Sequence, residues 1–356
     1  MTIKDTLISA KSKWAEGIGP DIDVVISSRI RLARNLKDYP FPHFMSEEQA
    51  ERILQGVRAA ALQDVAVEKT GRSEFILLSE LTDTERQILV EKHLISPHHI
   101  KDPVNRAVVL AADESVSIMV NEEDHLRIQC LLPGLQLEEA WNLANETDDI
   151  LENSLDYSFC EKKGYLTSCP TNVGTGLRAS VMLHLPCMVM TKQVGKVVAA
   201  IAQLGLAVRG YYGEGTEAYG NIFQVSNQVT MGHTEEEIVK NLLTVTRRIA
   251  AQERATREKV YKDNQSVLED RIFRSYGVMS HARVMTSQEA LKNISNLRLG
   301  VELGVLKNIN FAQINELIIL TRPAFLIQKA GKDLNAEERD LLRAEIIREK
   351  ITITAR

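Results

Sequence analysis

Short runs of apolar and β-branched residues recur along the first 230 residues, each bounded by polar or glycine-containing turns. Runs of this length and composition predict β-strands. The runs 115–120 and 126–132 are separated only by a polar turn, which predicts a hairpin and therefore antiparallel pairing. The predicted strands are 24–30, 75–78, 107–111, 115–120, 126–132, 206–212 and 221–230.

A helical hydrophobic period predicts helices between and after these strands. The clearest start is Ser46, which Glu48 and Gln49 follow closely, as in a capping box. From Thr234 the helical period continues almost to the C-terminus. The predicted helices are 3–16, 46–62, 137–159, 191–204 (ending at Gly205), 234–261 and the segments of 266–356, with breaks at Gly277, Gly304 and Pro323.

Together these elements predict an α/β fold, more narrowly α+β, with a mainly antiparallel sheet flanked by helices and an all-α C-terminal domain. We place the boundary so that residues 1–255 form the first domain and residues 256–356 the second. The apolar stretch 314–320 predicts burial in the helical domain's own core or against a second copy, and we expect a homodimer.

Composition narrows the functional classes. The chain has 356 residues, with 43 Lys and Arg against 48 Asp and Glu, so its formal charge is −5. This balance argues against a protein that coats nucleic acid. No apolar run is long enough to span a membrane, and the N-terminus lacks a signal-peptide pattern. Four cysteines without a CxxC motif predict reduced thiols and a cytoplasmic protein.

The common nucleotide-binding motifs are absent from the sequence, since it contains neither a GxxxxGK[ST] loop nor a GxGxxG after a strand. Arginines instead stand on several predicted strands and beside glycine-rich turns. Arg29 and Arg31 share one face of a strand, because side chains alternate. Singly, each arginine is most simply a surface or ion-paired residue; together they could clamp a polyphosphate. The set is Arg29, Arg31, Arg127, Arg178 and Arg209.

Two acidic turns and one cysteine are further candidates. The turn 121–125 contains three consecutive acids, for which a solvated turn is the simplest interpretation. Glu214 stands between two glycines, which suggests a mobile loop that brings a carboxylate to a ligand. Cys169 precedes a proline in a loop; most isolated cysteines are inert, but one beside arginines can be reactive. The histidines form no HExxH or HxxxH pattern, so we expect no zinc site.

Four blocks of sequence resemble, in the same order, the signature blocks of the phosphagen (guanidino) kinases, which include arginine kinase and creatine kinase. They are SRIRLAR at 28–34, NEEDHLR at 121–127, SCPTNVGTGLRAS at 168–180 and RGYYGEGTE at 209–217. Those enzymes carry an all-helical domain of about a hundred residues before the first block, which this chain lacks. Its helical C-terminal extension resembles instead the bacterial protein-arginine kinases of the McsB type, also at 90–97 and 339–344.

The resemblance implies ATP-dependent phosphorylation of arginine side chains in proteins. The missing domain favours protein substrates, since a protein-borne arginine needs an open site. By family position Glu123 is the base and Glu214 a second clamp, although the sequence does not separate these roles, and Cys169 contacts the guanidino group. The expected ATP-binding residues are Ser27, Ser28, Arg29, Ile30, Arg31, His93, Arg127, Arg178, Ala179, Ser180, Val181, Met182, Arg209, Gly210, Tyr211, Tyr212 and Gly213. Mg²⁺ is expected to be bound mainly through phosphates and water, with no protein metal site.

In the C-terminal domain the resemblance implies an allosteric phosphoarginine pocket. Its residues are Arg339, Asp340, Arg343 and Ala344. From the pattern alone, a salt-bridged surface helix is the simpler interpretation. The family's partners are an activator protein (McsA), a heat-shock repressor (CtsR) and a Clp unfoldase–protease. Two alternatives stay open: a kinase for free arginine or another small guanidine, and a catalytically silent phosphoarginine-binding adaptor.

Overall fold

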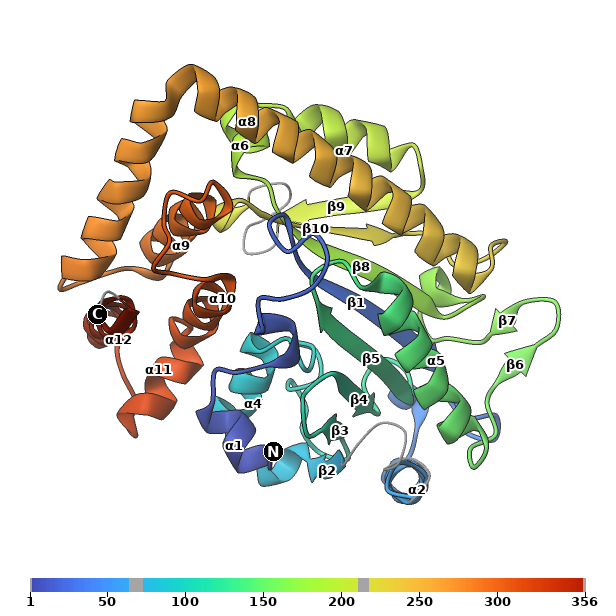
Figure 1. Ribbon diagram of the computed structural model, residues 1–356. Helices are drawn as coiled ribbons and strands as arrows, with labels where there is room; N and C mark the ends of the chain where they lie inside the picture. The colour runs from blue at the N-terminus through green and yellow to red at the C-terminus, as the bar shows by residue number, and fades with distance from the viewer. Residues whose placement is uncertain (1, 64–72, 211–217, 355–356) are drawn as a thin grey trace.

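The computed structural model describes residues 2–63, 73–210 and 218–354. Within these residues an eight-stranded sheet, antiparallel throughout, crosses the centre of the molecule in the order β2-β3-β4-β5-β1-β8-β10-β9 (Figure 1). The predicted fold class and the hairpin between β4 and β5 are confirmed. The strands are β1 Val25–Arg34, β2 Ser73–Leu77, β3 Ala107–Ala111, β4 Val116–Val120, β5 Leu126–Pro133, β6 Phe159–Cys160, β7 Gly164–Tyr165, β8 Leu177–His184, β9 Leu206–Gly210 and β10 Ile222–Asn227.

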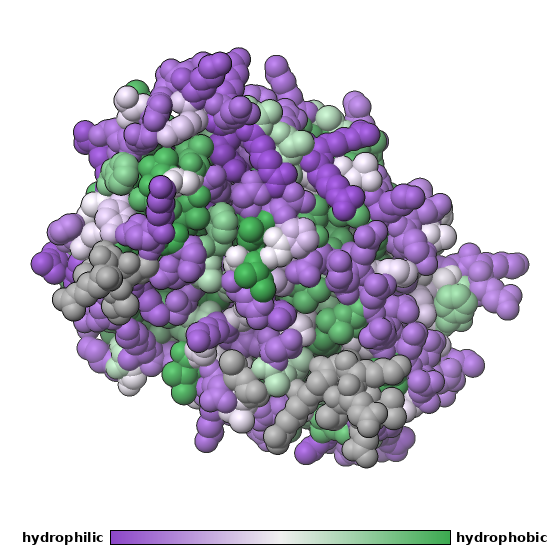
Figure 2. All heavy atoms as spheres, in the orientation of Figure 1, coloured by the Kyte–Doolittle hydropathy of each residue, from purple (hydrophilic) through white to green (hydrophobic). Residues whose placement is uncertain are grey.

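Helices surround the sheet. Ser46 caps α2 through the expected capping box with Gln49. The α-helices are α1 Ile3–Ile8, α2 Glu47–Ala61, α4 Asp83–Glu91, α5 Leu137–Glu152, α6 Pro186–Met190, α7 Val194–Ala202, α8 Glu235–His281, α9 Ser287–Glu302, α10 Phe311–Leu320, α11 Pro323–Ala330 and α12 Ala336–Thr354. None of those formed by the described residues is long and apolar enough to cross a membrane. Hydrophilic side chains cover most of the face in Figure 2, with hydrophobic ones in small groups between them.

The two faces of the sheet belong to different hydrophobic cores. One face, with Ile30 and Ile128, packs against α2, α5 and the first half of α8. The other face, with Leu131 and Met182, packs against α4, the N-terminal segment and helices α9 to α12. The C-terminal helices therefore complete the covering of the sheet that carries the candidate site.

Helix α8 connects the two cores. It contains residues 255 and 256, where we placed the boundary, and it bends at Asn264, whose backbone is not helical (Figure 1). We expected a break at Gly277, but this residue lies within the helix. Gly304 and Pro323 do lie at helix ends, as expected. A glycine costs a helix only about 1 kcal/mol relative to alanine. The buried Ile272 and Met279 on either side of Gly277 outweigh that cost.

Three predicted helices are shorter in the structure. The helix at 3–16 ends at Ile8 and is followed by the short 3-10 helix η1 Lys13–Ala15. The helix at 137–159 ends at Glu152, and that at 191–204 is reduced to α7. The early end of the first of these helices is explained by a partner that is distant in the sequence. The buried Lys92 Nζ donates to the carbonyls of Thr6, Ser9 and Lys11, which holds this stretch open.

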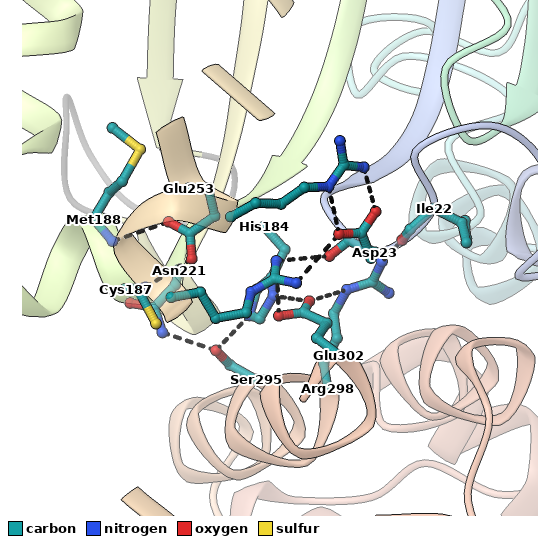
Figure 3. Close-up of polar contacts among 12 residues, drawn as sticks. Ile22, Asp23, His184, Cys187, Met188, Asn221, Glu253, Ser295, Arg298 and Glu302 are labelled. Atoms are coloured by element: carbon teal, nitrogen blue, oxygen red, sulfur yellow. Dashed lines mark hydrogen bonds and ion pairs between the residues drawn. The ribbon is translucent and has the colours of Figure 1, made fainter. Parts of the chain in front are cut away.

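A buried polar network joins α8 and α9 to the end of β8 (Figure 3). Glu302 lies within hydrogen-bond distance of His184 Nδ1, at 2.6 Å, and forms ion pairs with Arg257 and Arg298 at 3.3 Å each. Burial acts to raise the pKa of Glu302, but His184 and these two guanidinium groups lower it overall. Glu253 on α8 accepts the backbone N–H groups of Cys187 and Met188 at 3.0 and 2.9 Å. Burial raises the pKa of Glu253 to about 7.

Replacing Glu253 by glutamine is expected to make the protein less sensitive to pH. Because the folded-state pKa is raised, the folded protein holds a proton on Glu253 that the unfolded chain has lost. The free energy of unfolding therefore falls as the pH rises from about 4.5 towards 7. This one group accounts for about 2 kcal/mol between pH 5 and pH 8. Urea unfolding at both pH values should show a smaller decrease for Glu253→Gln than for the wild type.

The matched control is Glu258→Gln, at an exposed position on the same helix. It should leave the pH dependence as in the wild type. An equal stability difference between wild type and Glu253→Gln at pH 5 and pH 8 would show that Glu253 does not titrate in this window.

Candidate active site

The five predicted arginines lie on one face of the sheet, which we call the arginine face. Residues paired across antiparallel strands project to the same side. Arg31 on β1 pairs with Arg178 on β8, and Ala33 pairs with Arg127 on β5. Gln224 on β10 pairs with both Met182 and Arg209. Four separate strands therefore direct arginines to one side, as the alternation in the sequence suggested for β1 alone.

These arginines lie close enough to disturb one another's charge. Burial, followed by repulsion from Arg29, Arg127 and Arg178, lowers the pKa of Arg31 well below its usual value. Burial and the neighbouring Arg209 and Arg127 lower the pKa of Arg178. Among the described residues, Nε of Arg31 and Nε of Arg178 have no hydrogen-bond partner. Partly buried guanidinium groups that repel one another and keep free donors suit a polyanion such as a polyphosphate.

Arg29 is held in place by neighbouring strands. Its Nε donates to Ser180 Oγ at 3.3 Å and its guanidinium to Gln224 Oε1 at 3.1 Å. Together with Ser27, His93 and Met182 these residues line a small pocket. Sequence reasoning missed Gln224, because nothing in the local sequence shows that β10 lies beside β8.

His93 follows α4 with a left-handed backbone (φ 64°). Burial, with the charges of Arg29 and Arg322, lowers its pKa to about 3, so the ring is neutral at physiological pH. Its ring centroid lies 5.4 Å from that of Trp14. A neutral aromatic ring at the edge of the arginine face is suited to contact a flat, uncharged group such as a purine base.

The β4–β5 turn presents Glu123 beside the arginine face. Asn121, Glu122, Asp124 and His125 are buried, whereas the side chain of Glu123 is 45% exposed. Arg127 forms ion pairs with Glu122 at 2.7 Å and with Glu123 at 2.9 Å. The turn is therefore not the solvated acidic turn that its composition suggests, and Glu123 is its accessible carboxylate.

Asp124 ties this turn to the loop that carries Cys169. Its Oδ1 accepts hydrogen bonds from Asn35 Nδ2 and from the backbone N–H of Ser168, both at 2.7 Å. Asn35 Oδ1 in turn accepts the N–H of His125 at 2.9 Å. These residues, which we did not single out from the sequence, fix the position of Glu123 relative to Cys169.

Cys169 begins the 3-10 helix η4 Pro170–Asn172, and its sulfur lies 3.0 Å from Thr171 Oγ1. The same loop contains Gly174 (φ 112°), where a Cβ atom would lie 2.4 Å from the carbonyl oxygen of Thr230. Only glycine permits this close packing. Cys169 and Glu123 both act to raise the pKa of Arg178, opposing burial, so both lie near this guanidinium.

Some of the expected ATP-binding residues project away from the arginine face. Ser28, Ile30, Ala179 and Val181 occupy the alternate positions of β1 and β8, on the opposite side of the sheet. Ser28 Oγ donates to the carbonyl of Gly134 at 2.8 Å, and the three apolar side chains belong to the first core. Glu214, Tyr211, Tyr212 and Gly213 lie outside the described residues, and Gly210 is the last residue of β9.

The four C-terminal candidates all lie on α12. Arg343 is buried and donates to the carbonyls of Thr321 and Met285 at 2.9 and 2.8 Å, and also to Asp340. Arg339 donates to the carbonyl of Leu334 at 2.8 Å, and Ala344 is buried in the second core. In the described part of the chain, no cluster of three or more His, Cys, Asp or Glu side chains could hold a metal ion.

Comparison with known proteins identifies the family. Residues 52–256 match the ATP:guanido phosphotransferase C-terminal catalytic domain, and residues 265–356 match the protein-arginine kinase McsB C-terminal domain. The protein-arginine kinase of Desulforamulus reducens is 56% identical over 99% of this chain and 98% of its own length. The chain belongs to the protein-arginine kinases. The enzyme of the same name from Pelotomaculum thermopropionicum is 53% identical over 98% of each chain.

Solved structures agree with this assignment at the level of the fold. A lombricine kinase aligns with a TM-score of 0.57 and 24% identity, over 67% of this chain and 68% of that one. The substrate-free duplicated taurocyamine kinase of Schistosoma mansoni aligns with a TM-score of 0.56, over 71% of this chain and 35% of that one. As a member of the protein-arginine kinase family the chain is an ATP-dependent phosphotransferase.

Proposed function

We propose that this protein transfers the γ-phosphoryl group of ATP to the guanidino group of arginine residues in proteins at the arginine face. The observation that carries this proposal is the convergence of four arginines (Arg31, Arg127, Arg178 and Arg209), one accessible carboxylate (Glu123) and a loop cysteine (Cys169) on the face that also carries Arg29. We take the acceptor to be an arginine in a protein because the relatives that match over nearly their full length are named protein-arginine kinases.

In the proposed reaction a guanidino nitrogen attacks the γ-phosphorus, the new P–N bond forms, and the bond to the β,γ-bridging oxygen breaks to release ADP. The nitrogen loses its proton to a carboxylate, for which Glu123 is our candidate, with Glu214 as second clamp and Cys169 beside the guanidino group. A carboxylate is needed because a free guanidinium keeps its proton far above physiological pH and is therefore a poor nucleophile. The arginines stabilise charge on the transferred group, as catalytic arginines do in other phosphoryl transfers.

The nucleotide is proposed to bind against those described members of our predicted set that lie on the arginine face. Arg29, Arg31, Arg127, Arg178 and Arg209 bind its phosphates, and His93 contacts its base. The site offers guanidinium groups rather than a carboxylate cage, so Mg²⁺ is assigned to the phosphates and water. Because Arg127 forms an ion pair with Glu123 at 2.9 Å, phosphates that draw Arg127 away also release the carboxylate.

We also propose, from the family resemblance, that residues 1–255 perform catalysis and that residues 256–356 sense phosphoarginine and form a homodimer. Arg339, Asp340, Arg343 and Ala344 form the proposed sensing site. The partly exposed Asp340 and the polar edge of Arg339 are its accessible groups. An activator protein (McsA), a heat-shock repressor (CtsR) and a Clp unfoldase–protease are the proposed partners. No observation favours a free-arginine kinase or a silent adaptor over this function.

The test uses γ-labelled ATP and Mg²⁺, with casein in one tube and free arginine in the other. We expect label on the protein that is lost in acid, because a P–N bond hydrolyses where a serine phosphate survives. Glu123→Gln should lower the rate by at least about 100-fold, whereas Glu258→Gln on α8 should not. Label on free arginine alone would contradict the proposal in favour of a small-guanidine kinase. An acid-stable label on casein would contradict it in favour of hydroxyl phosphorylation.

A further inference from the structure

The β4–β5 turn borders a second pocket, beside Asn121 and Glu122, which takes no part in the proposed reaction. We propose that a pocket beside this turn holds a segment of the substrate polypeptide next to the arginine that is phosphorylated. This inference rests on the proposed function and adds to it a binding site for the residues that flank the target arginine. We call the pocket the flank pocket; it is formed by the start of α2, the segment 42–46 before and at its cap, the loop 102–106 and the turn residues Asn121 and Glu122.

The size and position of the flank pocket suit a polypeptide. Its volume is about 530 Å³, within the range of ligand sites in proteins. Glu122 lines it, and the next residue is Glu123, the candidate base. Arg127 contacts both carboxylates, at 2.7 and 2.9 Å, so the flank pocket and the arginine face meet at this guanidinium. A chain that offers an arginine to Glu123 therefore has its neighbouring residues at the mouth of the pocket.

The charge of the flank pocket selects a basic segment. Glu47 and Asp102 contribute carboxylates to its wall, whereas the third carboxylate, that of Glu122, is buried and paired with Arg127 at 2.7 Å. Its arginine, Arg106, directs its guanidinium to the backbone carbonyls of His98 and His99, at 2.8 and 3.1 Å. The cationic group is thus occupied within the fold, while Glu47 and Asp102 remain exposed to solvent. Complementary charge of this kind favours lysine or arginine beside the target residue.

Apolar side chains and one buried amide complete the match to a polypeptide. Val104 on the rim is 58% exposed, and Phe44, next to the lining residue Met45, is 74% exposed. In the buried wall, Asn121 Nδ2 donates to the carbonyls of Ala50 and Asn105, at 3.1 and 3.0 Å, which fixes the orientation of the amide. Among the described residues Asn121 Oδ1 accepts no hydrogen bond. Since this atom is buried, the amide contributes a rigid wall, and the exposed Val104 and Phe44 supply the contacts to a polypeptide.

The test reverses the charge of the exposed rim with the double variant Asp102→Lys and Val104→Lys. The matched control makes the same two changes on α8, Asp263→Lys and Val267→Lys, where both residues are also exposed. Two substrates are compared, N-acetyl-arginine amide and a peptide in which lysine and leucine flank a single arginine. We expect the rim variant to raise KM for the peptide about tenfold. Its kcat, its KM for ATP and its KM for the blocked arginine should match the control.

Each other outcome overturns one part of the proposal. Equal KM values for the peptide in the rim variant and the control would show that the flank pocket does not hold the substrate. A parallel rise in KM for the blocked arginine would show damage to the arginine site instead. A second readout needs no catalysis: fluorescence anisotropy with the same peptide carrying citrulline for arginine. If the wild type phosphorylates neither substrate yet binds this peptide more tightly than the rim variant does, the proposed function fails and the docking inference stands.

Discussion

Replacing Arg31 by methionine is expected to lower kcat/KM for protein phosphorylation by about a thousandfold and, at the same time, to raise the Tm of the nucleotide-free protein. The loss of rate follows from removing a guanidinium that stabilises charge on the transferred phosphoryl group. The gain in stability follows from burial and the repulsion by Arg29, Arg127 and Arg178, which both disfavour the charge on Arg31 in the folded protein. Steady-state kinetics and thermal unfolding, with and without ATP, measure the two effects.

Arg34→Met is the matched control, since Arg34 is a buried arginine on the same strand but on the opposite side of the sheet. Its guanidinium forms an ion pair with Asp148 at 2.6 Å and stacks on Tyr165 at 3.5 Å. Removing it leaves a buried carboxylate without its partner, which costs about 3–5 kcal/mol. If Arg31→Met also lowered Tm in the absence of nucleotide, the arginine face would be a structural ion-pair network and not a prepared anion site.

The second large effect is expected at the junction of α8, α9 and β8. Glu302→Gln removes a buried anion that His184, Arg257 and Arg298 all contact (Figure 3). Arg257 keeps an ion pair with Asp23 at 3.2 Å, but the buried Arg298 loses the carboxylate it is paired with, and the free energy of unfolding should fall by about 3 kcal/mol. Urea unfolding at pH 7 measures this as a lower Cm at unchanged m.

The comparison variant is Asp270→Asn, which removes the anion of an exposed ion pair with Arg274 on α8. Exposed pairs of this kind contribute less than about 1 kcal/mol. A Glu302→Gln protein as stable as Asp270→Asn would mean that the buried cations find other partners and that the network contributes little to stability.

Local sequence patterns predicted the central strands and the caps well, because these depend on neighbours in the chain. The strand at 107–111 and the cap at Ser46 are observed where they were expected. The predictions were wrong where a distant partner decides the structure. α1 ends at Ile8 because Lys92, more than eighty residues away, binds the carbonyl groups of Thr6, in the last turn, and of Ser9 and Lys11 beyond it.

The same distinction applies to the candidate site. Alternation along β1 placed Arg29 and Arg31 on one face, and the family blocks supplied the other arginines. Neither the alternation nor the family blocks showed that Ser28 and Val181 project to the opposite side. A block is a continuous stretch of sequence, so it includes residues from both faces of a strand. The burial of Asp124 also lay beyond the sequence, since its partners Asn35 and Ser168 come from separate segments.

Because the C-terminal helices are synthesised last, the packing of the sheet affects how the chain folds during translation. The N-terminal segment is joined to late helices, since Arg298 donates to the carbonyl of Ile22 at 2.6 Å and Asn315 to that of Ala15 at 3.4 Å. Leu131 and Met182, on the face that carries the arginines, share a core with helices α9 to α12. While the last hundred or so residues are still being translated, this face has apolar side chains open to water. The nascent enzyme is therefore itself an exposed, incompletely folded chain until its final helices emerge.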